Sequence, residues 1–173
     1  MRACVRGFLT IVVFTFVASP AVGQERKAVE VTPFMALGSI GASPLGVAIV
    51  FPVTSTLDIE TEVGYRRAEG HIHALSSSTS LLWNLPRIGR VTPYLAAGVG
   101  LAQYGAPVFS PGGYPIATQS RTAVTVNAGG GLKARIDEKV DLRTDARWFK
   151  SFGRHGSEHV RLAQGVAFDV GKR

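Results

Sequence analysis

The chain has 173 residues and a formal net charge of +7 at pH 7, from 19 Lys and Arg against 12 Asp and Glu. The basic residues are dispersed, with no basic run and no aromatic-stacking motif, so we expect no nucleic-acid partner. The only cysteine, Cys4, lies close to the first residue, and a chain with one cysteine has no internal disulfide.

Residues 1–23 have the order of parts found in a secretory signal peptide. Arg2 and Arg6 precede an apolar run from Phe8 to Val17, and small residues follow up to Gly23. The run is about ten residues long, whereas a membrane-spanning helix needs roughly 20. We therefore expect cleavage after Gly23 and export of one mature domain, residues 24–173, rather than a retained anchor.

Beyond residue 24 the sequence alternates with period two and shows no good helical period, which predicts an all-β domain. Turn residues divide this part of the chain into eight predicted strands. These strands are 28–38, 45–52, 57–67, 71–85, 91–104, 121–136, 139–150 and 159–170.

The predicted strand 57–67 alternates apolar and charged side chains. A face with so many charges does not fit the core of an ordinary β-sandwich. The turn before this strand is expected to set Ala48 opposite Glu60 and Gly46 opposite Glu62. The charged face consists of Asp58, Glu60, Glu62 and Arg66.

The predicted connections differ between the two ends of the strands. Those after the second, fourth and sixth strands are short, whereas the longest of the others runs from Gly105 to Ser120 and is rich in Gly and Pro. Tight turns at one rim and longer loops at the other are typical of outer-membrane barrels, with both chain ends on the periplasmic side. A sheet in lipid must also close on itself, because a free edge leaves backbone groups unpaired.

The predicted strand 139–150 repeats the alternation of charged and apolar residues. Its tight turn near Glu138 pairs it with strand 121–136, so that glycines lie opposite long charged side chains and leave room for them. The expected pairs are Gly129 with Arg147, Gly131 with Asp145 and Arg135 with Asp141.

If the apolar faces meet lipid, the charged faces point into the lumen. Strands 57–67 and 139–150 are four apart in an eight-stranded ring, so the acids of the first face the arginines of the second. Such a barrel is only just wide enough for its side chains to fill, and charges withdrawn from water need partners. The predicted ion-pair network consists of Glu60, Glu62, Arg66, Arg135, Asp141, Arg143, Asp145 and Arg147.

Aromatic residues are expected at both membrane interfaces of a spanning barrel. By their places in the predicted strands, three lie near the tight rim and three near the other. The two groups are Phe51, Trp83 and Phe168, and Tyr65, Trp148 and Phe152.

Three segments, Pro93–Leu101, Gly129–Ile136 and Val140–Phe149, resemble the small outer-membrane β-barrel family, which includes opacity-type proteins and the barrel of outer-membrane protein A. The likeness covers essentially the whole mature chain and is strongest over residues 91–170. It implies an eight-stranded antiparallel transmembrane up-and-down β-barrel in the outer membrane of a Gram-negative-type bacterium. Expected partners are outer-membrane lipids, lipopolysaccharide and, during insertion, the barrel-assembly machinery, and the barrel is expected to be a monomer.

One departure from the family concerns the end of the chain. Members usually finish on an aromatic residue that the assembly machinery reads, whereas here Phe168 is followed by the segment from Asp169 to Arg173. The departure bears on the efficiency of insertion more than on the fold.

Two histidine motifs are candidate chemical sites. His71 and His73 share a strand face but lack a clear third ligand, so we expect no metal and no other cofactor. His155 and Ser157 resemble the His-x-Ser pair of barrel enzymes that deacylate lipid A, but Glu158 stands where those enzymes have Asn. We therefore expect no enzymatic activity, and a lipid A deacylase is a remote alternative.

Two functions from different classes remain open. The first is a structural or surface-interaction barrel with a lumen closed by ion pairs, which presents the loop from Gly105 to Ser120. The alternative is a small porin-like channel for ions or small apolar solutes. A soluble barrel is disfavoured because its outward apolar residues would leave a large apolar patch in water. The channel is favoured by the small inward residues Ala96, Gly98, Gly100 and Ala102.

Overall fold

The computed structural model describes residues 28–38, 45–67, 73–110, 115–153 and 156–171. The predicted signal peptide and His71 and His155 lie outside these ranges. None of the described residues forms a helix long and apolar enough to cross a membrane.

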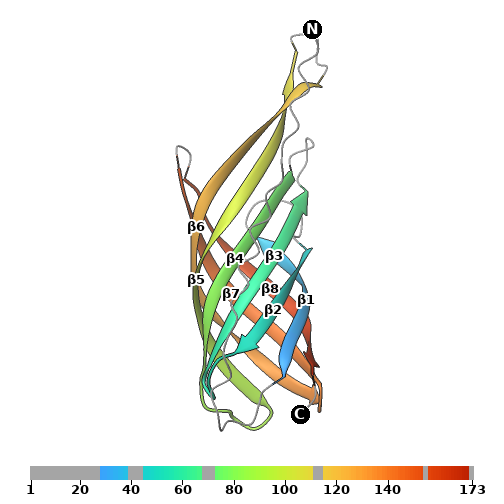
Figure 1. The fold of residues 1–173 in the computed structure, drawn as a ribbon, viewed down its shortest axis with the longest axis vertical. Coiled ribbons are helices and arrows are strands. Elements are labelled where there is room, and N and C mark those ends of the chain that lie inside the picture. The colour runs from blue at the N-terminus through green and yellow to red at the C-terminus, as the bar shows by residue number, and fades with distance from the viewer. Residues whose placement is uncertain (1–27, 39–44, 68–72, 111–114, 154–155, 172–173) are drawn as a thin grey trace.

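The described residues form a closed antiparallel barrel of eight strands, each paired with its neighbours in the sequence, with β1 and β8 joined last (Figure 1). This confirms the predicted architecture. The strands are β1 (Val29–Gly38), β2 (Leu45–Pro52), β3 (Leu57–Arg67), β4 (His73–Asn84), β5 (Val91–Phe109), β6 (Pro115–Asp137), β7 (Val140–Phe152) and β8 (Glu158–Val170).

The prediction of a loop from Gly105 to Ser120 was wrong. β5 and β6 continue as a paired hairpin up to Phe109 and Pro115, and they rise well beyond the other strands (Figure 1). The Gly and Pro residues suggested irregular chain, but pairing of β5 with β4 ends at Gly105. Beyond that point the described residues pair β5 with β6 alone.

The predicted register between β2 and β3 was wrong by two residues. Ala48 pairs with Glu62 rather than Glu60, and Gly46 pairs with Gly64. The turn is wider than expected, because Thr54 Oγ1 accepts a hydrogen bond from the backbone N–H of Leu57 at 2.9 Å. A shift of two residues keeps every side chain on its expected face, so the inward position of the acids is unaffected. The other strand ends agree with the prediction or differ from it by one or two residues.

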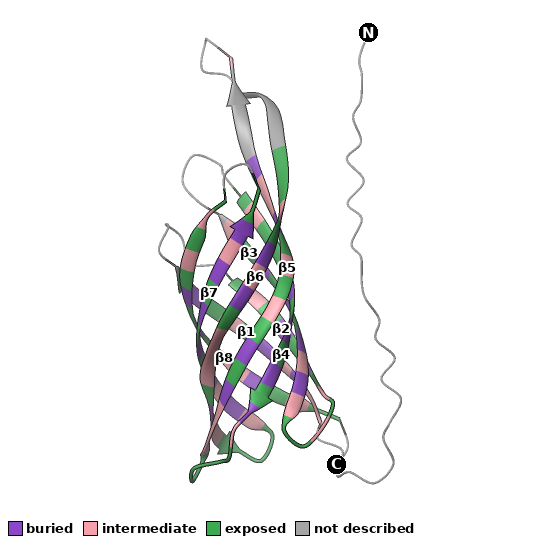
Figure 2. Ribbon diagram, turned by 90° about the vertical axis from the view of Figure 1, so that its left-hand side faces the viewer, coloured by how far each residue is buried: buried purple, intermediate pink, exposed green. Residues whose placement is uncertain are grey.

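The two faces of the wall have opposite chemistry. Exposed and less exposed residues alternate along the strands, which gives the banded pattern of Figure 2. Outward residues such as Leu81, Leu95 and Leu162 are about half exposed, with exposed fractions of 50%, 49% and 54%. Inward residues are largely polar or charged, an arrangement expected of a barrel that is surrounded by lipid rather than by water.

Candidate functional site

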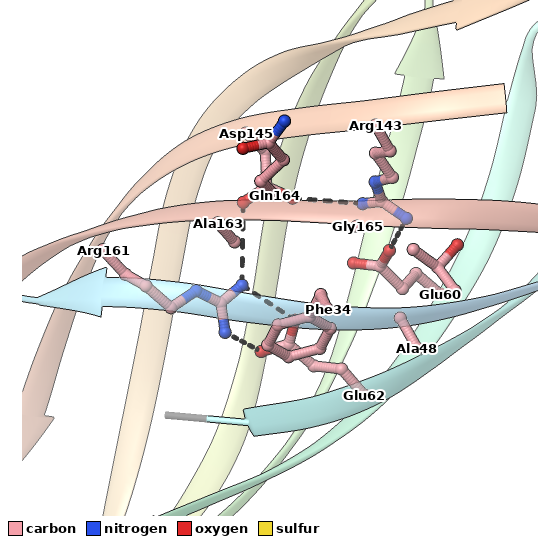
Figure 3. Close-up of a pocket in the computed structure, with 11 residues that line it drawn as sticks. Phe34, Ala48, Glu60, Glu62, Arg143, Asp145, Arg161, Ala163, Gln164 and Gly165 are labelled. Atoms are coloured by element: carbon pink, nitrogen blue, oxygen red, sulfur yellow. Dashed lines mark hydrogen bonds and ion pairs between the residues drawn. The ribbon is translucent and has the colours of Figure 1, made fainter. Parts of the chain in front are cut away.

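The centre of the lumen is a carboxylate shared by two arginines. Glu60, on β3, is fully buried and forms ion pairs with Arg143 and Arg147 on β7, the second at 2.7 Å from Arg147 Nη2 to Glu60 Oε1. β3 and β7 lie on opposite sides of the ring, so these contacts cross the lumen. Figure 3 shows the guanidinium of Arg143 directed at Glu60. The predicted meeting of these residues is confirmed.

Asp145 and Tyr94 extend the cluster. Asp145 Oδ2 lies 3.3 Å from Arg143 Nη2 and 3.1 Å from Arg147 Nη2. The hydroxyl of Tyr94, on β5, donates to Asp145 Oδ2 at 3.0 Å and accepts from Arg143 Nε at 2.8 Å. Because Tyr94 is 1% exposed, its ring fills the part of the lumen beside β5 as well as joining two charges.

A second layer lies nearer the rim opposite the tight turns and is built on Arg161 of β8. Its two terminal nitrogens donate to the two oxygens of Glu62 at 2.8 and 2.9 Å, a bidentate pair that fixes both side chains. The guanidinium also lies between Phe34 and Phe149, 5.1 and 4.8 Å from the ring centroids. His159 stacks on the ring of Phe149, with 5.3 Å between the centroids.

A third layer lies near the tight turns. Lys133 Nζ lies 2.6 Å from Glu30 Oε2, which ties β6 to β1 across the lumen. Arg135 Nε lies 2.6 Å from Asp141 Oδ1, and this predicted pair is therefore confirmed. At the same end Asn84 Nδ2 donates to Asp58 Oδ2 at 2.6 Å. Charged side chains thus occupy the lumen at three successive levels.

The network also includes residues outside the prediction, among them Glu30, Tyr94, Lys133 and Arg161. The alternation that places Arg135 inward also places Lys133 inward. On β8, Val160 and Leu162 point outward, so Arg161 between them points inward. The inward position of both residues was therefore predictable from the sequence. Prediction of their partners requires knowing which strands face each other at each level of the lumen. The predicted Arg66 lies on the same inward face of β3, nearer the Arg67 end of the strand than Glu60.

Glycines on β6 let the long side chains of β7 lie flat against the wall. Gly129 pairs with Arg147 and Gly131 with Asp145, as predicted. A side chain at Gly129 would overlap the backbone oxygen of Ala146 and approach Arg147 Cα at 2.7 Å. The glycine therefore permits close approach of the two strands behind the central cluster.

We expect Gly129→Ala to lower the free energy of unfolding by about 1–3 kcal/mol, because backbone must shift to accept the methyl group. The matched control is Gly64→Ala, whose methyl group would meet the hydroxyl of Ser76 at 3.0 Å and approach the backbone of a neighbouring strand no closer than 3.9 Å, at the oxygen of Leu45, so a side chain rather than backbone must adjust. Urea unfolding of the refolded protein in lipid vesicles measures both. Equal midpoints for the two variants would contradict this role of Gly129.

The row of small residues on β5 does not leave an open path along the wall. Side chains added at Gly98 and Gly100 would overlap the backbone of β4 at Thr79 and Ser77. Glycine at these positions allows β5 and β4 to lie close together, and it does not create open space in the lumen. A small cavity does lie beside the ion pairs and is lined from β1, β2, β3, β7 and β8, by residues that include Phe34, Ala48 and Arg161 (Figure 3).

Each histidine motif has one member, His71 or His155, outside the described residues, so the structure does not test either motif. No group of three His, Cys, Asp or Glu side chains lies close enough to hold a metal ion within the ranges that the structure covers. Ser157 is partly exposed in the β7–β8 connection, and its backbone oxygen accepts the N–H of Ser151 at 2.9 Å.

No protein-family model matches the sequence, and no curated protein matches it. Several solved structures match the fold. Neisserial surface protein A (NspA) superposes with a TM-score of 0.66 at 15% identity, over 82% of this chain and 96% of that one. The N-terminal β-barrel domain of Pseudomonas aeruginosa OprF gives 0.61 at 20% identity, over 84% and 100%. The outer-membrane enzyme PagL gives 0.52 at 14% identity, over 82% and 99%.

These comparisons confirm the resemblance that the sequence suggested, at the level of the fold. The protein has the fold of the small eight-stranded outer-membrane β-barrels, and its lumen contains a buried ion-pair network. The neighbours include both an enzyme and a surface protein, so function must be argued from the site rather than from the fold.

Proposed function

We propose that the protein is an exported outer-membrane barrel with a structural or surface-interaction role, whose lumen is closed by its ion pairs. The observation that carries the proposal is the contact of Glu60 with both Arg143 and Arg147 across the lumen. Side chains 0–4% exposed, held by ion pairs from opposite walls, leave no room there for a passing solute. A porin-like channel needs the opposite arrangement, with charges spread along open walls.

The proposal includes the location and the partners. Residues 1–23 act as a cleaved signal peptide, the barrel-assembly machinery inserts the mature chain, and its outward face contacts outer-membrane lipids and lipopolysaccharide. The fold of the structural neighbours and the half-exposed apolar outward residues support this location. We assign the protein no catalytic role and no cofactor.

The β5–β6 hairpin is the part that we propose to be presented outside the cell. It is the longest projection of the barrel and lies at the rim opposite the tight turns (Figure 1). A paired hairpin holds its surface in a more defined shape than a free loop does, because backbone hydrogen bonds fix it.

Protease access in intact cells tests this arrangement. A protease site inserted after Ser110 should be cut from outside, whereas the same site inserted after Arg87, in the β4–β5 turn, should be cut only after the cells are broken. Heat-dependent gel mobility checks that each variant is a folded barrel. Cleavage after Arg87 but not after Ser110 in intact cells would show the opposite orientation. If the membrane fraction contained no folded barrel, the proposed location would be refuted.

A further inference from the structure

The lipid-facing wall carries a primary amide that lipid cannot satisfy. Gln164, on β8, points outward between Leu162 and Val166 and is exposed. In Figure 3 its amide is directed away from the ion pairs of the lumen. It has no hydrogen-bond partner among the described residues.

Gln164 lies midway between the two predicted aromatic groups. Along β8 it is four residues from Phe168, on the side of the tight turns, and four from Val160, which pairs with Trp148. Each interval corresponds to about 13 Å of strand. The amide therefore lies near the middle of the apolar band, where hydrocarbon offers no donor or acceptor and an unpaired polar group is unfavourable.

The surroundings of Gln164 contain a second gap in hydrogen bonding. The β1–β8 ladder skips Thr32 and Pro33, and the backbone oxygen of Pro33 faces Gly165 on β8. The N–H and C=O of a residue in an antiparallel strand point to the same neighbour, so the donor that proline lacks is missing on the β8 side. Thr144, on β7, pairs with Gln164 and is also outward and exposed, so the polar patch extends onto β7. Elsewhere on the wall, Thr61 and Thr79, on β3 and β4, lie 3.5 Å apart, hydroxyl to hydroxyl.

We propose that the outward face of β1, β7 and β8 is an interface between two copies of this chain in the membrane, centred on Gln164. Two barrels inserted in the same direction are related by a two-fold axis along the membrane normal, which brings the same patch of each copy together. A primary amide carries both a donor and an acceptor, so two such amides on the axis satisfy each other with two hydrogen bonds. The apolar residues around it, including Met35, Leu37 and Leu162, then pack between the copies.

This inference rests on the proposed function only in requiring that the barrel lies in a bilayer. The proposed dimer differs from the monomer that the sequence resemblance implies. One outward polar residue hardly changes the alternation along a strand, so the sequence pattern does not reveal the interface. The association is expected to be weak, since single hydrogen bonds between membrane segments contribute modestly.

Energy transfer between labelled copies tests the interface. The chain from residue 24 onward, which lacks Cys4, is labelled through a cysteine placed at Ser55 and refolded into phosphatidylcholine vesicles at a series of protein-to-lipid ratios. Transfer should rise with protein density, and Gln164→Leu should weaken the association about tenfold. The matched control is Thr79→Val, a polar-to-apolar change on the opposite wall, which should leave the association unchanged.

Disulfide trapping gives a second readout that does not depend on affinity. A cysteine at Gln164 should form a covalent dimer under mild oxidation, whereas a cysteine at Thr79 should not. Equal energy transfer for wild type and Gln164→Leu, or equal trapping at both positions, would overturn the proposal. Heat-dependent gel mobility shows separately whether each variant is a folded barrel, so loss of the interface is distinguishable from failure of the barrel itself.

Discussion

Replacement of Glu60 by Gln is expected to lower the free energy of unfolding by about 3–5 kcal/mol, the usual cost of removing one partner from a buried ion pair. Glu60 is shared by Arg143 and Arg147, so the change leaves two buried guanidinium groups with one fewer anion. Asp145 remains in contact with both arginines, whereas Glu30 Oε1 lies 3.7 Å from Arg143 Nη1 and Glu62 Oε2 lies 3.8 Å from Arg147 Nη1, so these two carboxylates are more distant. The amide keeps the size of the side chain, so the loss reports charge rather than packing.

The matched control for this variant is Glu158→Gln, at the rim opposite the tight turns. Glu158 also forms an ion pair, 2.8 Å from Lys150 Nζ, but both side chains are largely exposed to solvent. Surface pairs of this kind contribute little, so we expect no measurable change. Urea unfolding in vesicles, followed by gel mobility, measures both variants. A loss of similar size for Glu60→Gln and Glu158→Gln would contradict the assignment of Glu60 to a buried cluster.

Replacement of Arg161 by Leu is expected to cost about 3 kcal/mol or more, because Glu62 loses its bidentate partner inside the lumen. The nearest remaining cation is Arg147, whose Nη1 lies 3.8 Å from Glu62 Oε2. The change also removes the guanidinium from between Phe34 and Phe149.

A second substitution separates charge from packing at this level. When Glu62→Leu is added to Arg161→Leu, the uncompensated carboxylate disappears and two apolar side chains fill similar space beside the two phenylalanines. Replacing both members of a buried pair is often nearly neutral, so the double variant should recover most of the lost stability. The test is a double-mutant cycle by urea unfolding. If the double variant were as unstable as the sum of the single ones, the two residues would not act as a pair.

The fold was predictable because its main signals are local. Period-two alternation in segments such as Leu57–Arg66 sets which side chains share a face, and this information survives a register error of two residues. The network core followed from strand order alone, since the third and seventh strands of eight must face each other. That inference needs no distances and correctly joined Glu60 to the arginines of β7.

The predictions that failed concern features that depend on neighbouring strands rather than on the segment itself. The Gly and Pro residues between Gly105 and Ser120 suggested a loop, but their effect depends on whether a strand lies alongside, which the local sequence does not reveal. The role of Tyr94 was missed for a related reason. An aromatic residue in an apolar segment gives no sign that its hydroxyl will lie between Arg143 and Asp145.

The central claim is that the ion pairs close the lumen, and single-channel recording in planar bilayers tests it most directly. We expect no steady conductance from the refolded wild-type barrel, with heat-dependent gel mobility used to establish that the protein is folded. Steady conductance from the folded wild-type protein, increasing further in Glu60→Gln, would contradict the closed lumen and identify a small pore instead.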